Sequence, residues 1–372
     1  MSAADLIPLV DLHWQHTQVA ADIAAGWDDV LRDARFLQGT RVAAFERAFA
    51  AFQGVPHCAA VANGTDALEL AGRAVGLQAG DRVMLPANTF AATAFAFMRM
   101  GLQPVLVDCE PEHLLIDPAQ IDRRMQAGVR AVVPVHLFGQ MARMEAIEGA
   151  LGGREVVVIE DAAQAQGASR LGQGAGSFGA VAATSFYPGK NLGAYGDGGA
   201  VLTASQDVDG RVRALRNYGS EVKYEHPQLG FNSRLDELQS VVLLAKLHHL
   251  AEWNAARTRA AAVYDELLAP LGERVRRPSA AAGNVHAWHL YVIRLPHRDR
   301  VLKHLLAAGI GAAVHYPRPL HLQGALDSLG YRRGDFPVAE QAAAEILSLP
   351  LFPGITPVQQ QRVVDELKKA CP

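Results

Sequence analysis

The fold is constrained most by short apolar runs that alternate with segments of helical spacing, after a helical lead-in over residues 11–53. The apolar runs are expected strands and cover residues 59–62, 82–85, 104–108, 131–135 and 155–160. Segments between them, such as 66–75 and 89–100, carry helical spacing. This rhythm predicts an α/β fold with a mostly parallel sheet covered by helices on both faces. Ligands of such sheets bind beyond the carboxyl ends of the strands.

Polar residues follow the first and second expected strands. Asn63-Gly64-Thr65 precedes a helical pattern, so its backbone N–H groups and the Thr65 hydroxyl could bind a phosphate. Simple capping of the helix by Asn63 or Thr65 explains the same residues without a ligand. After the second strand, Phe90 could stack on a flat ring, or it could belong to the core.

The fifth expected strand ends at Glu160, and Asp161 and Gln164 follow it. Side chains alternate along a strand, so Glu160 and Asp161 should point to opposite faces. A buried carboxylate is costly unless a cation meets it, and Asp161 would suit the protonated ring nitrogen of pyridoxal phosphate. A capping or ion-pair role for Asp161 remains the alternative.

The segment S-F-Y-P-G-K-N-L-G-A-Y-G-D-G-G, residues 185–199, places Lys190 among glycines with no charged neighbour at hand. An amine that is kept from water loses part of the solvation of its charged form, so its pKa falls and it can attack a carbonyl. Lys190 is therefore a candidate Schiff-base lysine, although a glycine-rich turn that happens to carry a lysine is possible. Ser185 lies where its hydroxyl could contact the phosphate of a ring held by Lys190.

Residues 174–179 satisfy the pattern G-x-G-x-x-G that is typical of dinucleotide-binding sites. That pattern has meaning only where a strand precedes it and a helix follows it directly. Here a polar loop precedes it, and residues 180–186 have the character of a strand. We therefore interpret these glycines as a turn and reject a nicotinamide cofactor.

A long helical pattern continues through Arg259, and from about residue 251 the sequence changes to a smaller α/β unit. We expect a large domain over residues 1–250, with an N-terminal arm, and a small domain over residues 251–372. Histidines cluster in the small domain, but no carboxylate or thiolate accompanies them at metal-ligand spacing, so no metal is expected.

The composition excludes several classes of protein. The net charge is −3 with no run of one sign, so neither a nucleic-acid surface nor a membrane surface is expected. No apolar run approaches about 18 residues, and no basic region precedes the first apolar residues, so we expect an unexported protein. Cys58, Cys109 and Cys371 are too few and too far apart for a disulfide framework, which favours the cytoplasm.

Several motifs occur together in one order: N-G-T-D-A-L, E-D-A-A-Q, the Lys190 segment, R-N-Y-G-S, G-F-N-S-R-L-D-E-L-Q and H-Y-P-R-P-L-H. By the identity and order of these motifs, the chain resembles the DegT/DnrJ family of pyridoxal-phosphate sugar aminotransferases over nearly its whole length. The resemblance implies a fold-type I aminotransferase with a large and a small domain. It also implies a homodimer that shares its active sites, with L-glutamate and a nucleotide-linked keto sugar as substrates.

The resemblance assigns roles residue by residue. Lys190 would hold the cofactor, with Asp161 on the ring nitrogen, Gln164 near the ring hydroxyl and Phe90 stacked on the ring. The phosphate would be held by Gly64, Thr65, Ser185 and, from the neighbouring subunit, Asn232. The expected sugar contacts are His136, Tyr187, Tyr218, Arg234, His315, Tyr316 and His321.

Within the family, the motifs are most similar to enzymes that aminate C-3 of a dTDP-linked 3-keto-6-deoxyhexose. Phe138 departs from the tyrosine that is frequent in the corresponding H-L-Y-G motif. Amination at C-4, or of a UDP-linked sugar, is the alternative within the family. A non-catalytic regulatory protein that binds pyridoxal phosphate is the alternative of another class.

Overall fold

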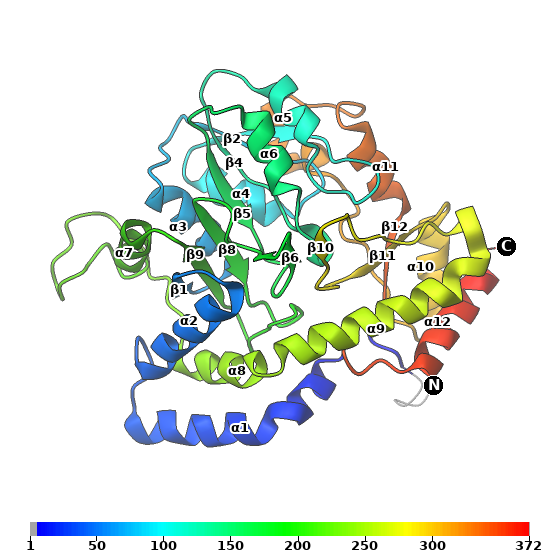
Figure 1. Ribbon diagram of the computed structural model, residues 1–372, viewed down its shortest axis with the longest axis horizontal. Helices are drawn as coiled ribbons and strands as arrows, with labels where there is room; N and C mark the ends of the chain where they lie inside the picture. The colour runs from blue at the N-terminus through cyan, green and yellow to red at the C-terminus, as the bar shows by residue number, and fades with distance from the viewer. Residues whose placement is uncertain (1–5, 372) are drawn as a thin grey trace.

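A seven-stranded sheet forms the centre of the computed structural model, which describes residues 6–371 (Figure 1). Its strands are β1 (His57–Val61), β2 (Arg82–Pro86), β3 (Gln103–Val107), β4 (Val129–Val132), β5 (Val157–Asp161), β8 (Val181–Ser185) and β9 (Gly199–Thr203). Their order across the sheet is β1-β9-β8-β5-β4-β2-β3. All neighbouring strands are parallel except where β9 pairs with β1 and β8. The expected mostly parallel α/β sheet is confirmed.

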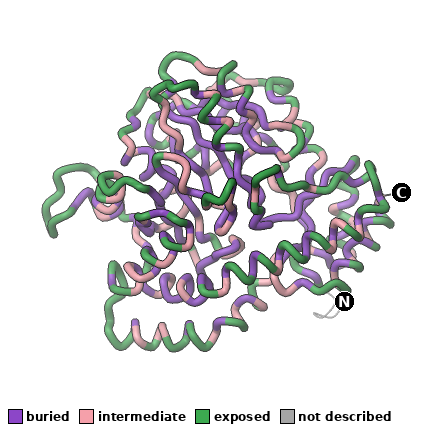
Figure 2. Tube along the Cα trace, viewed as in Figure 1, coloured by how far each residue is buried: buried purple, intermediate pink, exposed green. Residues whose placement is uncertain are grey.

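Helices cover both faces of the sheet. One face packs against α3 (Gly64–Ala74), α4 (Ala91–Arg99), α7 (Gln206–Leu215) and α11 (Pro337–Glu345). The other packs against α2 (Thr40–Gln53), α5 (Pro118–Arg124), α6 (Met144–Leu151) and α8 (Glu237–Leu247). In β1, for example, Ala59 and Val61 belong to the first core, whereas Cys58 and Ala60 belong to the second. The sheet is consequently buried, with the exposed chain lying mainly around it (Figure 2).

A smaller unit follows α8. Its helices α9 (Leu250–Leu268), α10 (Arg298–Ala307) and α12 (Pro357–Ala370) pack on a sheet of two antiparallel strands, β11 (Tyr291–Arg294) and β12 (Ile346–Leu349). The long helix expected through Arg259 is interrupted, because α8 ends at Leu247 and α9 begins at Leu250. A domain boundary near residue 250 stays a prediction, and it coincides with this interruption.

The large and small units are also joined through short strands and through backbone hydrogen bonds. The strand β10 (Asn284–Val285) pairs with β6 (Ser169–Arg170), which in turn pairs with β7 (Gln173–Gly174). Nearby, the backbone N–H of Leu290 donates to the carbonyl oxygen of Phe138 at 3.1 Å, and that of Ala287 donates to Gly139 at 2.8 Å. These contacts bring the start of β11 to the loop that follows β4.

The first described residues pair with the small unit rather than with the sheet. Ile7 donates its backbone N–H to Gly309 at 3.0 Å and accepts one from Gly311 at 2.7 Å, and Leu351 donates to Leu9 at 3.1 Å. The helix α1 (Leu12–Asp33) follows and packs against α8. Among residues 6–371, no helix has the length and apolar character needed to span a membrane.

Candidate active site

Asp161 is the last residue of β5, and its carboxylate is buried. Its Oδ2 accepts a hydrogen bond from the Thr93 hydroxyl at 2.8 Å, and its Oδ1 accepts one from the Ala163 N–H at 3.1 Å. Burial raises the pKa of Asp161, because these two donors and the nearby Lys190 compensate only in part for lost hydration. A protonated ring nitrogen would supply the missing cation.

Lys190 lies in the turn that follows β8. The backbone N–H of Lys190 donates to Tyr187 at 2.8 Å, and that of Ala194 donates to Phe186 at 2.8 Å, so the chain folds back closely on itself. The amine is withdrawn from bulk water, and this desolvation lowers the pKa of Lys190 to about 8, although the Asp161 carboxylate opposes the shift. Within the described residues, Nζ makes no hydrogen bond or ion pair. The amine is therefore available for reaction.

The end of β1 and the start of α3 form a close-packed corner with β8 and β9. Asn63 caps α3, since its Oδ1 accepts the Asp66 N–H at 2.8 Å. A Cβ on Gly64 would stand 2.6 Å from the Cβ and 3.1 Å from the Oγ of Ser185. In the described part of the chain, the backbone N–H groups of Gly64 and Thr65 have no acceptor. This corner therefore offers N–H donors beside the Ser185 hydroxyl, which fits a phosphate.

Pyridoxal phosphate requires an amine for its aldehyde, an acid for its ring nitrogen and donors for its phosphate. Lys190 has an unpaired amine and Asp161 a buried, partly compensated carboxylate, and both lie at the end of the sheet where Gly64 and Ser185 meet. The residues present thus fit this cofactor. The geometry also explains why glycine stands at position 64.

Gln164, Tyr316 and Phe90 form a group beside Asp161. The Gln164 Oε1 accepts the Phe138 N–H at 2.7 Å, and its Nε2 donates to the Tyr316 hydroxyl at 3.1 Å. The Phe90 ring is 54% exposed, and its centroid lies 5.1 Å from that of Tyr316. Burial and the Asp161 charge raise the pKa of Tyr316, so its hydroxyl stays protonated. The Phe90 ring is thus accessible for stacking, as a cofactor-facing role requires.

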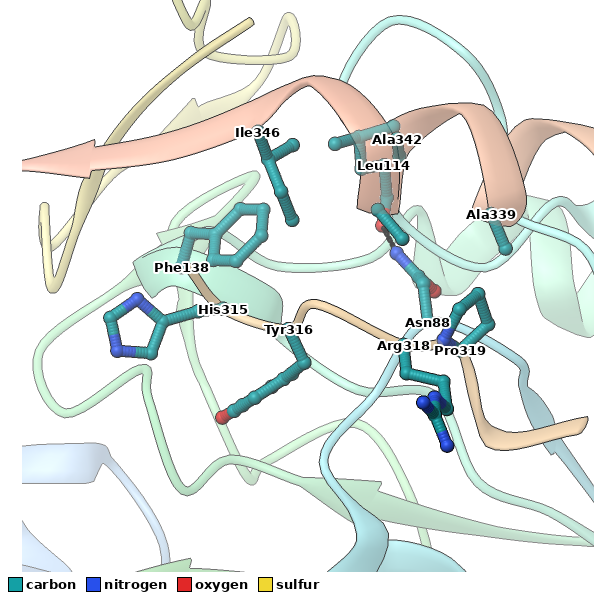
Figure 3. Close-up of a pocket in the computed structure, with 11 residues that line it drawn as sticks. Asn88, Leu114, Phe138, His315, Tyr316, Arg318, Pro319, Ala339, Ala342 and Ile346 are labelled. Atoms are coloured by element: carbon teal, nitrogen blue, oxygen red, sulfur yellow. Dashed lines mark hydrogen bonds between the residues drawn. The ribbon is translucent and has the colours of Figure 1, made fainter. Parts of the chain in front are cut away.

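A small cavity of about 10 Å³ is lined by Phe138, His315 and Tyr316 together with residues of α11 and β12. Figure 3 shows these side chains around it. His315 Nδ1 lies 2.7 Å from the Ser348 hydroxyl. Burial and the Lys190 charge lower the pKa of His315 to about 4, so its ring is neutral near pH 7. His315 and Tyr316 thus belong to the same region as Lys190 and Asp161.

His136 and His321 are held within the protein instead. His136 Nε2 lies 2.8 Å from Glu160 Oε2, and its Nδ1 accepts the Ala142 N–H at 3.2 Å. His321 Nε2 lies 2.9 Å from Glu340, and its ring packs on Phe336. Both imidazoles are fully buried, and His136 has no ring nitrogen left for a sugar.

The remaining candidates lie on exposed segments. Tyr187 and Tyr218 are 60% and 46% exposed, and Asn232 is exposed and bridges to Asn217 through its backbone. The Arg234 guanidinium lies 5.6 Å from the Tyr218 ring centroid. Tyr218, Asn232 and Arg234 thus form a separate group at the base of the projecting loop between α7 and α8 (Figure 1).

Two residues of the site were not foreseen. Thr93 donates to Asp161, and its hydroxyl lies 2.9 Å from that of Thr89, four residues earlier. His289 is buried, with Nδ1 at 3.2 Å from Asn191 Oδ1, and burial together with the Lys190 charge lowers its pKa. The i, i+4 threonine pair after a strand was a possible signal for Thr93, whereas nothing in the sequence placed His289 near Lys190.

Comparison with known proteins gives one consistent result. Residues 17–368 match the model of the DegT/DnrJ/EryC1/StrS aminotransferase family. The "Pleiotropic regulatory protein" of Geobacillus stearothermophilus is 44% identical, with 97% of each chain covered. The dTDP-3-amino-3,4,6-trideoxy-alpha-D-glucose transaminase of Streptomyces venezuelae is 40% identical, covering 98% of this chain and 96% of the relative. The UDP-N-acetyl-3-dehydro-alpha-D-glucosamine 3-aminotransferase of Acidithiobacillus ferrooxidans is 41% identical, with 99% of each chain covered.

Solved structures agree with this assignment. The crystal structure of S. venezuelae DesV in complex with a ketimine intermediate has a TM-score of 0.95 and 40% identity, with 98% of each chain covered. NtdA from Bacillus subtilis, with bound cofactor PMP, has a TM-score of 0.92 and 29% identity, covering 99% of this chain and 85% of the other. The chain therefore belongs to the DegT/DnrJ/EryC1/StrS aminotransferase family, as the sequence motifs indicated, and is a fold-type I transaminase that depends on pyridoxal phosphate.

Proposed function

We propose that this enzyme transfers the amino group of L-glutamate to a nucleotide-linked keto sugar. The preferred acceptor is C-3 of a dTDP-linked 3-keto-6-deoxyhexose, in the biosynthesis of a deoxyamino sugar. The observation that carries the proposal is the pair of Lys190, whose amine has no partner among the described residues, and Asp161, whose buried carboxylate lacks full compensation. The motifs N-G-T-D-A-L and H-Y-P-R-P-L-H and the dTDP-sugar transaminase relative support the choice of sugar.

Pyridoxal phosphate supplies an aldehyde that condenses with amines and a ring that accepts electrons from the reacting carbon. The residues assigned to it are Gly64, Thr65, Phe90, Asp161, Gln164, Ser185, Lys190 and, from a second subunit, Asn232. Asp161, fixed by Thr93 and Ala163, would keep the ring nitrogen protonated. Lys190 Nζ, with a pKa of about 8, would accept and return the proton that moves during amino transfer. Such acid–base help contributes about 10²- to 10⁴-fold in rate.

The sugar would contact Tyr187, Tyr218, Arg234, His315 and Tyr316. His136 and His321, the other expected sugar contacts, would act indirectly, because His136 holds Glu160 of β5 and His321 holds Glu340 of α11. Because Asn232 is exposed and its side chain has no partner among the described residues, we propose a homodimer in which this segment reaches the partner's cofactor. We place the enzyme in the cytoplasm, with a large domain over residues 1–250 and a small domain over residues 251–372.

A UDP-linked 3-keto sugar is a second candidate acceptor, because a UDP-sugar 3-aminotransferase relative is 41% identical over almost the whole chain. The test is to incubate purified enzyme and L-glutamate with dTDP- and UDP-linked 3-keto and 4-keto sugars and to identify the aminated products by mass spectrometry. Amination of the dTDP-linked 3-keto sugar at the highest kcat/KM is expected. Amination of only UDP-linked or 4-keto sugars would overturn the preferred assignment. Failure to bleach the cofactor's visible band with L-glutamate would overturn the choice of amino donor.

A further inference from the structure

The segment from His315 to Leu320 crosses the edge of the sheet where the candidate active site lies. It is fixed at both ends, because His315 Nδ1 lies 2.7 Å from the Ser348 hydroxyl and the Leu320 N–H donates to the Ala87 carbonyl at 2.7 Å. Ala87 directly follows β2, so this second anchor stands at the carboxyl end of a central strand. The segment therefore has a defined position over the site.

Two side chains of this segment extend to the same side. Figure 3 shows Tyr316 and Arg318 both pointing away from Ala339, Ala342 and Ile346. The Tyr316 hydroxyl meets Gln164 beside Asp161, so that side of the segment faces the reacting groups. In this view Arg318 is exposed and leaves the segment on the same side as Tyr316.

The Arg318 guanidinium has no partner within the described residues. It is exposed and makes no hydrogen bond, ion pair or ring contact. Pro317 and Pro319 flank it and restrict the backbone of the segment, so that the side chain starts from a fixed point. An unpaired arginine on a stiff backbone is suited to the bidentate binding of phosphate.

The spacing along the chain matches the length of the substrate. The Cα atoms of Tyr316 and Arg318 are two residues apart, which allows at most about 7 Å between them. A hexose bound with its keto carbon at the cofactor extends its anomeric oxygen, and then its diphosphate, by a similar length. An amino acid bound at the cofactor instead keeps its α-carboxylate directly beside the reacting carbon.

We propose that Arg318 binds the diphosphate of the nucleotide sugar and thereby selects sugars that carry a nucleoside diphosphate over free sugars. This inference rests on the proposed function, since it concerns the acceptor of the same site. Arg318 acts in binding and takes no part in proton transfer. It contributes to the half-reaction with the sugar and not to the half-reaction with L-glutamate.

Arg333 provides a matched control. It is an exposed arginine that lines a neighbouring cavity of about 260 Å³, to which Arg318 also contributes, but its Nη1 lies 4.0 Å from Glu340. Removing Arg333 changes the net charge by the same amount as removing Arg318. A general electrostatic effect would therefore weaken both variants equally, whereas a specific diphosphate contact affects Arg318 alone.

The experiment compares wild type, Arg318→Ala, Arg318→Lys and Arg333→Ala, each loaded with cofactor. Calorimetric titration with dTDP and with UDP measures nucleotide binding without any reaction. We expect Arg318→Ala to weaken nucleotide binding by at least about tenfold, the range for a lost charged hydrogen bond. The lysine variant should recover part of the affinity, and Arg333→Ala should match wild type. With the keto sugar, Arg318→Ala should raise KM by a similar factor and leave kcat within about twofold.

Two results would overturn the inference. The first is a nucleotide affinity of Arg318→Ala equal to that of wild type, or a loss of nucleotide affinity in Arg333→Ala as large as that in Arg318→Ala. The other is a raised KM for L-glutamate in Arg318→Ala, which would make Arg318 a carboxylate site. The rate at which L-glutamate alone bleaches the cofactor band tests the proposed transamination separately. If that reaction is absent while dTDP binding still depends on Arg318, the proposed function fails and the nucleotide site stands.

Discussion

Glu160 and Asp161 are consecutive buried carboxylates at the end of β5, and their surroundings differ completely. Glu160 accepts hydrogen bonds from the backbone N–H groups of Gly176, Phe178 and Gly179, and it pairs with His136. Asp161 accepts only two within the described structure, from Thr93 and Ala163. The donors outweigh burial at Glu160 and lower its pKa, whereas burial dominates at Asp161 and raises its pKa.

The difference separates an acid that the fold fully satisfies from one that it satisfies only in part. Glu160 gains from the fold all the partners that an anion needs, so it stabilises the folded chain. Burying the Asp161 carboxylate costs folding free energy, and its hydrogen bonds offset only part of that cost. A bound cation beside the carboxylate would offset the remainder. A buried acid with too few donors, facing an unpaired lysine, therefore indicates where a ligand binds.

The largest expected effect comes from removing the amine that faces Asp161. Lys190→Ala should lower the transamination rate by at least about 10⁴-fold, because both covalent attachment and proton transfer are lost. The assay is single-turnover amination of the keto sugar, together with borohydride reduction and peptide mass spectrometry to locate the cofactor.

Lys246→Met is a suitable control for this change. Lys246 is buried, and its Nζ donates to the Gly193 carbonyl at 2.6 Å. The Lys246→Met variant should therefore keep the cofactor on Lys190. A borohydride adduct on Lys246 in the wild-type enzyme, or wild-type turnover in Lys190→Ala, would contradict the assignment.

Asp161→Asn should lower the rate of transamination by about 10²- to 10³-fold, which is the effect of losing one preorganised electrostatic partner. The same change should leave the unfolding temperature of the cofactor-free protein unchanged or higher, because it removes an incompletely compensated charge. Stopped-flow kinetics and calorimetry measure the two effects. A cofactor-free Asp161→Asn protein that is much less stable would show that Asp161 has a structural role like that of Glu160.

Covalent attachment of the cofactor should depend on pH through Lys190. Its pKa is about 8, and only the neutral amine attacks an aldehyde, so the attachment rate should rise with pH and level off above about 8. Below that value the rate should fall by about tenfold per pH unit. Absorbance measured after mixing cofactor-free protein with pyridoxal phosphate follows the process. A rate that still rises tenfold per unit above pH 9 would mean that the amine is not desolvated.

Glu160→Gln should affect stability more than chemistry. Placing an amide N–H opposite backbone donors leaves buried groups unpaired, which should lower the free energy of unfolding by about 1–3 kcal/mol. Denaturant unfolding measures this loss. The rate of the L-glutamate half-reaction should stay within a few fold of wild type. A hundredfold slower half-reaction with unchanged stability would reverse the roles assigned to the two acids.

The smallest expected effect concerns acid unfolding. The pKa of Glu160 is lower in the folded protein than its ordinary value of 4.5, so below that value the unfolded chain binds more protons. Its contribution to stability is present above about pH 4.5 and is lost as the pH falls. Glu160→Gln should therefore reduce the loss of unfolding free energy as the pH falls below about 4.5. An identical loss in wild type and variant would show that Glu160 is not charged in the folded protein.

The sequence predicted the sheet well, because apolar runs report burial directly. Expected strands at 59–62, 82–85 and 104–108 fall within one or two residues of β1, β2 and β3. The fourth differs, since residues 131–135 were expected and β4 ends at Val132. Pro134 has no N–H to donate to a neighbouring strand, so regular pairing stops before it.

The sequence points to a candidate site most directly where chemistry is carried by a residue's type and place in a motif, as proposed for Lys190 and Asp161. It was less predictable where a role depends on which way a side chain turns. His136 follows a strand end like the other candidates, but its ring turns into the protein toward Glu160. Thr93 supports Asp161 from a helix 68 positions earlier in the chain, and only the packed structure brings the two together.

Because Ile7 and Leu9 pair with the small unit, this N-terminal segment cannot reach its final contacts until late in translation. These residues emerge from the ribosome early, but their partners Gly309, Gly311 and Leu351 are made about 300 residues later. The central sheet can therefore assemble before the partners of Ile7 and Leu9 have been synthesised. Closing the two ends of the chain would then be a late step, sensitive to any truncation that removes the last hundred residues.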